Sequence, residues 1–281
     1  MITMIATKRN CGEHVGMVFF DLAKAFDTVW HRGLLAKLEV TFRVEDAALR
    51  WISSYLSARS QAVRLSYFLS DPLPVTSGVP QGSILGPLLF LLYVNDLPSV
   101  VPDVSLYADD TGLICSDSSP AQLLLTMQHR INSTVMWMQT WKLQPNLDKT
   151  EAMYISSSPP DQPLYFPDST MPIRVVTQHK HLGVMFDCKL SWAAHVNCVC
   201  KRTSSALGVL QPHCTHLPIQ CKLLFYQCYI LPIFDYCDTA WCGLSDTTLS
   251  QLEVHHRFIL KILYNKDRCF PSDALYRLAH T

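Results

Sequence analysis

Apolar and polar positions divide the first part of the chain into a short strand and two helices. Residues 15–21 form an apolar run of strand length that ends in the carboxylate of Asp21. Residues 27–38 predict a helix. Residues 45–58 predict a second helix, because four side chains fall on one face: Ala48, Ile52, Tyr55 and Leu56.

The middle of the chain predicts a loop, a buried helix and a hairpin. Residues 71–83 are rich in proline and glycine, which indicates an ordered loop, and they run into the apolar helix of residues 84–94. Residues 104–115 resemble two short strands around a tight turn that carries Asp109 and Asp110. A long amphipathic helix follows over residues 121–141.

The last third of the chain has a helical pattern. Residues 156–172 are rich in Ser, Pro and Asp and predict a linker or hairpin region. Beyond residue 191, apolar side chains recur at helical spacing in several segments. This order of elements predicts an α+β fold followed by an all-helical lobe.

Composition identifies a globular chain with a large core. The 281 residues suffice for one large or two small domains. Hydrophobic residues make up 49% of the chain and charged residues only 16%, a composition that excludes a disordered linker protein. The longest apolar stretch covers about half a bilayer, and the N-terminus lacks the pattern of a signal peptide. We therefore expect an intracellular protein without a membrane span, whose eleven cysteines are reduced thiols.

The charges are balanced in total but unevenly distributed. The 23 basic and 23 acidic groups give a net charge of zero, which argues against a simple basic nucleic-acid binder. Residues 65–129 nevertheless contain six aspartates and no Lys or Arg, so this window carries −6 and each flank carries +3. The acidic centre needs a chemical explanation.

Carboxylates that meet at one end of a sheet suit a hard divalent cation. Asp109 and Asp110 lie next to each other on the predicted hairpin, and Asp21 ends a strand that could pair beside it. Three such groups repel one another without a cation, and their oxygens favour Mg²⁺ or Mn²⁺. The alternative is that the aspartate pair belongs to an ordinary turn and that Asp21 caps a strand end.

Five segments, in this order, resemble the palm motifs of reverse transcriptases, and the closest match is the non-LTR (LINE-type) retrotransposon family. They are Phe20-Asp-Leu-Ala-Lys-Ala-Phe-Asp-Thr-Val29, Ser77-Gly-Val-Pro-Gln-Gly-Ser-Ile-Leu-Gly-Pro-Leu-Leu-Phe90, Tyr107-Ala-Asp-Asp110, Asn146-Leu-Asp-Lys-Thr150 and His181-Leu-Gly-Val184. The four-residue motif alone is weak evidence, whereas five ordered motifs are strong.

The resemblance implies a right-hand polymerase palm, an antiparallel sheet with helices, followed by a helical thumb-like region. We expect the palm in residues 1–195 and the helical region in residues 196–281. Only twenty residues precede Asp21, so the fingers are expected to be largely missing, as in an N-terminally truncated enzyme. The implied activity is RNA-directed DNA synthesis, with RNA template, DNA primer and deoxynucleoside triphosphates as partners. The alternative is a catalytically inactive palm-thumb remnant that binds nucleic acid or a partner. An RNA-copying palm polymerase is a weaker third possibility.

The family pattern also implies residue roles. Asp21, Asp109 and Asp110 would hold two Mg²⁺ (or Mn²⁺) ions, and Lys149 would protonate the leaving pyrophosphate. Leu182 and Gly183 would form the primer grip. The nucleotide would lie against Leu22, Lys24, Ala25, Phe26, Gln81 and Gly82, where Phe26 excludes a ribose 2′-hydroxyl.

Several of these residues have plainer interpretations. Phe26 could be ordinary core packing, Gln81 and Gly82 an ordinary turn, and Lys149 a surface lysine. A cluster of Cys and His residues also raises the question of zinc, but without a Cys-x-x-Cys pair we expect inert thiols. The nearest candidate zinc ligands are Cys188, His195, Cys198 and Cys200.

Overall fold

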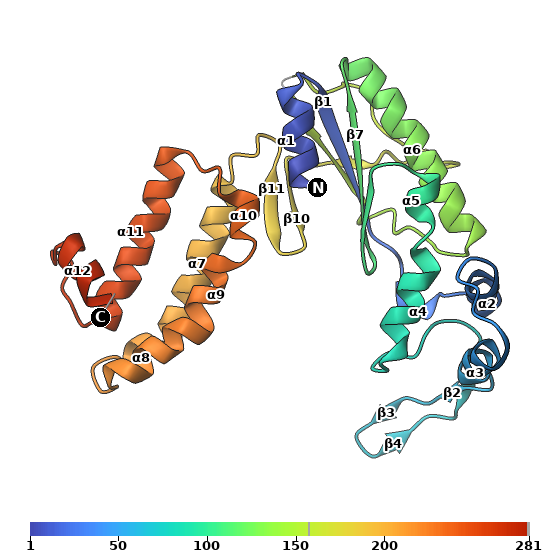
Figure 1. Ribbon diagram of the computed structural model, residues 1–281, viewed down its shortest axis with the longest axis horizontal. Coiled ribbons are helices and arrows are strands. Elements are labelled where there is room, and N and C mark those ends of the chain that lie inside the picture. Colours follow the sequence, from blue (N-terminus) through green and yellow to red (C-terminus); the bar gives the residue numbers. More distant parts are fainter. Residues whose placement is uncertain (157, 280–281) are drawn as a thin grey trace. The chain divides into compact units, whose positions relative to one another are not determined.

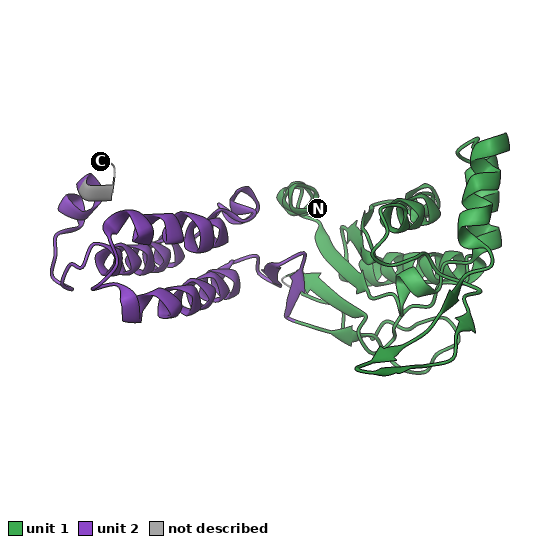
Figure 2. Ribbon diagram, turned by 90° about the horizontal axis from the view of Figure 1, so that it is seen from below, with its two compact units in different colours: residues 1–176 green, residues 177–281 purple. Residues whose placement is uncertain are grey.

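The computed structural model describes residues 1–156 and 158–279. The chain divides into two compact units, Met1–Val176 and Thr177–Thr281 (Figure 2). The first unit thus ends at Val176, whereas the sequence predicts that the palm ends at residue 195. The two units describe how the chain packs, and the functional boundary at residue 195 stays a prediction.

Unit 1 is built on a five-stranded sheet with β1 in its centre. The strand order is β6-β7-β1-β8-β9, and every pair is antiparallel except β8 with β9. All residues of β1 except His14 are buried, and this strand contacts the helices α6 and α1 as well as its two neighbouring strands. The strands are β1 (His14–Phe20), β6 (Val104–Tyr107), β7 (Asp110–Asp117), β8 (Glu151–Ile155) and β9 (Arg174–Val175).

The long helix α6 (Pro120–Thr140) packs along β1 and β7 (Figure 1). Ser119 caps it by accepting a hydrogen bond from the backbone N–H of Gln122, at 3.2 Å. Its apolar stripe, which includes Leu123 and Met127, is buried against the sheet. The other helices of the unit are α1 (Ile2–Asn10), α2 (His31–Val40), α3 (Asp46–Leu56), α4 (Leu85–Val94) and α5 (Leu97–Val100).

A hairpin of short strands extends from the end of α3 and returns to the loop before α4 (Figure 1). Its outer pair is β2 (Ser60–Gln61) with β5 (Leu73–Pro74), and its tip pair is β3 (Arg64–Leu65) with β4 (Phe68–Leu69). We call residues 59–75 the arginine hairpin. All its residues but Val75 are exposed.

Unit 2 begins with the hairpin of β10 (Gln178–His181) and β11 (Val184–Asp187) and continues as helices. Leu207 of α7 and Ile259 of α11 are central to its separate apolar core. The helical elements are α7 (Ala193–Leu210), η2 (Gln211–His213), α8 (Ile219–Phe225), the π-helical turn η3 (Tyr226–Ile230), α9 (Leu231–Asp235), α10 (Asp238–Trp241), α11 (Asp246–Leu263) and α12 (Ser272–Ala279).

The α+β class with a helical last third is confirmed, but four local predictions need correction. The helix predicted over 27–38 begins at His31, after the 3₁₀ turn η1 (Ala25–Asp27). The helix at 84–94 is buried on one face only. Strand β8 was not predicted. For residues 156–172, of which residue 157 lies outside the described residues, the sequence predicts a linker or hairpin; the linker alternative is wrong, because Leu164 and Phe166 are buried in the core of unit 1, and Tyr165 forms an antiparallel bridge with Pro172.

Lys37 is a buried cation that ties α2 to α4 and α6. Its side chain is 3% exposed, and its ammonium group donates hydrogen bonds to the carbonyl of Tyr93 and to Asp96. The same nitrogen lies 3.6 Å from the centre of the Trp141 ring, within cation–π range. Burial lowers the pKa of Lys37 to about 8, although Asp96 acts in the opposite direction.

This pKa predicts a pH-dependent contribution to stability. In the unfolded chain the amine keeps the ordinary pKa of 10.5, so between pH 8 and 10.5 the unfolded state binds more protons than the folded state. Stability contributed by Lys37 therefore rises with pH in this window. In urea titrations, the free energy of unfolding of wild type relative to Lys37→Met should increase by on the order of 1 to 2 kcal/mol from pH 8 to 10. Parallel profiles for the two proteins would contradict this.

The loop before α4 is docked onto the segment that follows β1. The backbone N–H of Gly78 donates to the carbonyl of Val29, and that of Val79 donates to Phe26, both at 2.8 Å. Gly78 has a φ of +88°, and a Cβ there would lie 2.8 Å from the backbone of Asp27. Only glycine fits this close approach in a left-handed conformation.

Two glycines in this loop provide a matched test of that fit. Gly82 also has a positive φ (+77°), but a Cβ there meets nothing within 4 Å. Gly82→Ala should therefore lower the free energy of unfolding by about 1 kcal/mol through backbone strain alone. Gly78→Ala should lower it by a further 1 to 3 kcal/mol or so, because the methyl group also overlaps Asp27. Urea unfolding measures both, and equal losses would refute the docking of this loop.

Candidate active site

The register between β1 and β7 brings two of the predicted acids to the same end of the sheet. Phe20 pairs with Thr111 at the end of this register. The residues next to this pair, Asp21 after β1 and Asp110 at the start of β7, therefore lie at the same end of the two neighbouring strands. Asp109 lies in the two-residue turn between β6 and β7. The carboxylates of Asp109 and Asp110 are exposed, and the side chain of Asp21 is 40% exposed.

The turn beside these acids has a strained backbone. Ala108 has a φ of +52°, a left-handed conformation that a residue with a Cβ adopts at a cost of about 1 to 2 kcal/mol. Pairing of Tyr107 with Asp110 closes the hairpin around it. Such strain persists only where the surrounding structure holds it in place, and here the pairing of β6 with β7 does so.

The segment after α6 fixes the backbone around Asp21. The carbonyl of Asp21 accepts a hydrogen bond from the backbone N–H of Asn146 at 2.7 Å, and Ala23 donates to Gln144 at 2.9 Å. Lys149, on the same segment, has its ammonium nitrogen 3.8 Å from Oδ2 of Asp21. The structure thus brings Lys149 next to a predicted metal ligand, although both side chains are partly in solvent and the ion pair is screened.

The oxygen donors at this edge fit a hard divalent cation in kind. Asp21, Asp109 and Asp110 are acceptor-only groups open to solvent, as such an ion requires. Within the described residues, however, no three His, Cys, Asp or Glu side chains stand close enough together to hold a metal ion. This holds equally for the zinc candidates around His195. A bound divalent ion therefore remains a prediction, and rotation of the exposed carboxylates would have to close the site.

The predicted nucleotide residues come from two neighbouring segments. Leu22 is buried in a β-bridge with Pro145, Lys24 is exposed with a φ of +50°, and Ala25 is buried. The ring of Phe26 packs on Phe90 of α4 with their centroids 4.5 Å apart. Core packing and a sugar-facing role are thus compatible for Phe26, because its ring is only partly buried.

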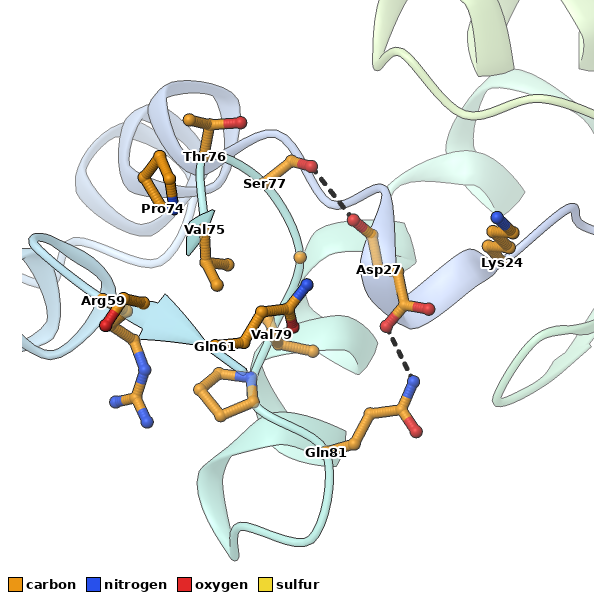
Figure 3. A pocket seen from close by; sticks show the side chains of 13 residues that line it. Lys24, Asp27, Arg59, Gln61, Pro74, Val75, Thr76, Ser77, Val79 and Gln81 are labelled. Atoms are coloured by element: carbon orange, nitrogen blue, oxygen red, sulfur yellow. Dashed lines mark hydrogen bonds between the residues drawn. The ribbon is translucent and has the colours of Figure 1, made fainter. Parts of the chain in front are cut away.

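Gln81 and Gly82 lie on the exposed side of the docked loop. The amide nitrogen of Gln81 donates to Oδ1 of Asp27 at 2.7 Å (Figure 3). This bond uses one of the two amide hydrogens and fixes the side chain beside the segment that carries Phe26. The sequence did not predict a hydrogen-bond partner for Gln81, and the resemblance assigned no role to Asp27, which accepts this bond.

A cavity of about 730 Å³ lies between this loop and the base of the arginine hairpin (Figure 3). Lys24 and Gln81 line one part of it, and Arg59 and Gln61 line another. Sequence reasoning missed the two hairpin residues. The available signal was charge, because residues 47–70 contain three arginines and no acid.

The predicted primer-grip turn closes the first hairpin of unit 2. Leu182 and Gly183 both have positive φ, +47° and +84°, as a tight two-residue turn requires. The hydroxyl of Tyr236 donates to the carbonyl of Leu182 at 2.7 Å and supports the turn from within the same unit. The role of this turn with a primer stays a prediction.

No helix in the described part of the chain is long and apolar enough to cross a membrane.

Comparison with known proteins gives consistent results. The sequence profile described as reverse transcriptase (RNA-dependent DNA polymerase) matches residues 3–186. A probable RNA-directed DNA polymerase from transposon X-element of Drosophila melanogaster is 27% identical over 99% of this chain and 31% of its own length. The RNA-directed DNA polymerase from mobile element jockey of the same fly is 27% identical over 80% of this chain and 25% of its own length. The chain thus spans about a third or less of these relatives.

Solved structures with a similar chain trace include telomerases. Telomerase from Candida albicans in complex with a TWJ fragment of telomeric RNA aligns with 100% of this chain and 54% of that chain, with a TM-score of 0.49 and 11% identity. Apo telomerase from Candida tropicalis covers 94% of this chain and 45% of that chain, with a TM-score of 0.47 and 13% identity. On the profile match, which extends over most of the sequence, and on the fly relatives, the chain belongs to the reverse transcriptase family, among those of LINE-type retrotransposons.

Proposed function

We propose that this chain is the catalytic part of an RNA-directed DNA polymerase. It would join a primer 3′-hydroxyl to the α-phosphate of a deoxynucleoside triphosphate and release pyrophosphate. The observation that carries the proposal is the β1–β7 register, which sets Asp21 beside Asp110 at the turn of the Tyr-Ala-Asp-Asp motif. An RNA template and a DNA primer would be its macromolecular partners.

The residues of the chain would act mainly by positioning and electrostatics. Asp21, Asp109 and Asp110 would hold two divalent ions, which supply charge neutralisation at the phosphates and activation of the hydroxyl. Lys149, whose ammonium nitrogen lies 3.8 Å from Oδ2 of Asp21, would donate a proton to the departing pyrophosphate. The docked loop would hold Gln81 and Gly82 against the nucleotide.

A nucleic-acid-binding module without catalysis is the second candidate. It is favoured by the absence, among the described residues, of three acidic side chains that already converge on one point. Both candidates predict binding of nucleic acid, so that property does not separate them. Only the polymerase predicts primer extension that depends on the individual carboxylates.

The polymerase proposal predicts a loss of primer extension when one of these carboxylates is removed. Asp109→Asn should reduce Mg²⁺-dependent extension of a DNA primer on an RNA template by on the order of 100-fold or more, because a ligand charge is removed where the reacting phosphate is bound. Asp117→Asn is the matched control, since it lies at the opposite end of β7 and should extend like wild type. Equal extension by the Asp109 variant would remove the metal assignment, and no extension by wild type with any divalent ion would favour the binding module.

A further prediction concerns sugar selection by Phe26. Phe26→Ala should raise incorporation of ribonucleotides relative to deoxynucleotides by about tenfold or more, because the ring that would meet the 2′-hydroxyl is gone. Phe26→Tyr keeps the ring and should retain the wild-type preference. Single-nucleotide incorporation kinetics with each substrate measure the ratio. An unchanged ratio in the alanine variant would mean that Phe26 serves only as packing for Phe90.

A further inference from the structure

The arginine hairpin and α3 carry three arginines against two acids, Asp46 and Asp71, which lie at the start of α3 and on the returning arm of the hairpin. Residues 47–70 contain Arg50, Arg59 and Arg64 and no Asp or Glu, although the whole chain is neutral. Such a local charge attracts a polyanion without making the protein basic overall. The neutral chain therefore contains one stretch, residues 47–70, in which every charged side chain has the sign that nucleic acid requires.

The tip of this hairpin exposes aromatic rings to solvent. Tyr67 is 100% exposed and Phe68 is 81% exposed, and neither belongs to the core of unit 1. Tyr67 lies in the turn that Leu65 and Phe68 close by pairing, so the rings stand on a short, defined support. Exposed rings next to arginines are the combination with which proteins bind unstacked bases of a single strand.

The base of the hairpin adds a polar groove between these rings and the proposed nucleotide site. Arg59 lies in the wall of the 730 Å³ cavity together with Lys24 and Gln61 (Figure 3). Asp27 is the acid in that lining, and Gln81 already donates to its carboxylate. A guanidinium N–H of Arg59 donates to the carbonyl of Tyr55 at 3.2 Å, which orients the group and leaves other N–H donors on the same fork.

We propose that the arginine hairpin binds the single-stranded RNA template ahead of the position being copied. Arg59 and Arg64 would contact phosphates, and Tyr67 and Phe68 would stack on unpaired bases. Rings at an exposed turn cannot reach the bases of a duplex, which are already stacked on one another, so a single strand is the expected ligand. The identity of the strand as template rests on the proposed polymerase function.

Fluorescence anisotropy of the complete chain with a labelled 12-nucleotide oligo(U) tests the binding. Arg59→Gln with Arg64→Gln should weaken binding and reduce the slope of log affinity against log salt by about 0.7 for each phosphate that the protein no longer neutralises. Tyr67→Ala with Phe68→Ala should weaken binding about tenfold or more at both low and high salt, with the slope unchanged. Circular dichroism should show the same folded state for all variants, because these side chains are exposed.

Matched controls separate this proposal from its alternatives. Arg9→Gln removes an exposed arginine from α1, and Leu69→Ala removes an exposed apolar side chain from the hairpin without removing a ring. Both should bind oligo(U) like wild type. The proposal is overturned if Leu69→Ala weakens binding as much as removal of both rings, or if an RNA duplex shows the same losses of affinity. It is equally overturned if sedimentation shows that the hairpin instead pairs two copies of the chain.

Failure of this inference can be told from failure of the polymerase proposal. Asp109→Asn should bind oligo(U) with wild-type affinity whether or not it extends a primer. If wild type extends primers but the hairpin variants bind and extend normally, the hairpin inference is wrong and the polymerase stands. If no protein extends a primer while the hairpin variants still lose affinity, the hairpin is an RNA-binding element and the polymerase proposal is wrong.

Discussion

The antiparallel register of β1 with β7 is the constraint on which the candidate site depends. Side chains alternate between the two faces of a strand, so a slip of one residue would turn Asp21 away from the face it now shares and would bury polar groups in the core. Gly16 opposes such a slip, because any other residue brought to its place on β1 would have its Cβ overlap the side chain of Met127 on α6. The acids are therefore located by hydrophobic packing that lies entirely behind them.

A second level of positioning connects the site to the helices. Hydrogen bonds from Gly78 and Val79 join the loop before α4 to the segment after β1, and Lys37 joins α2 to α4 and α6. Both sets of interactions link segments that are about fifty residues or more apart in sequence. The segment carrying Phe26 is thus held from one side by a close backbone approach and from the other by the core.

Periodicity and motif order predicted the central strand, the acid-bearing turn and the long helix α6, because each has a strong local pattern. They missed β8, since Glu151–Ile155 is a short run without polar–apolar alternation. They left residues 156–172 open as a linker or hairpin, because many Ser and Pro residues outnumber the two apolar side chains, Leu164 and Phe166, that decide the packing. The partner of Gln81 and the cavity wall at Arg59 depend on tertiary interactions that no local pattern encodes.

Under the proposed sugar-selecting role of Phe26, its packing on Phe90 has a consequence for how substrate choice would change. Phe90 is fully buried in α4 and forms part of the surface on which the Phe26 ring rests. A smaller side chain at Phe90 would let that ring tilt or retreat without altering any group that a nucleotide could touch. Selection acting on the interior of the protein could thus relax or tighten discrimination between sugars, while the sequence of the motif itself stayed the same.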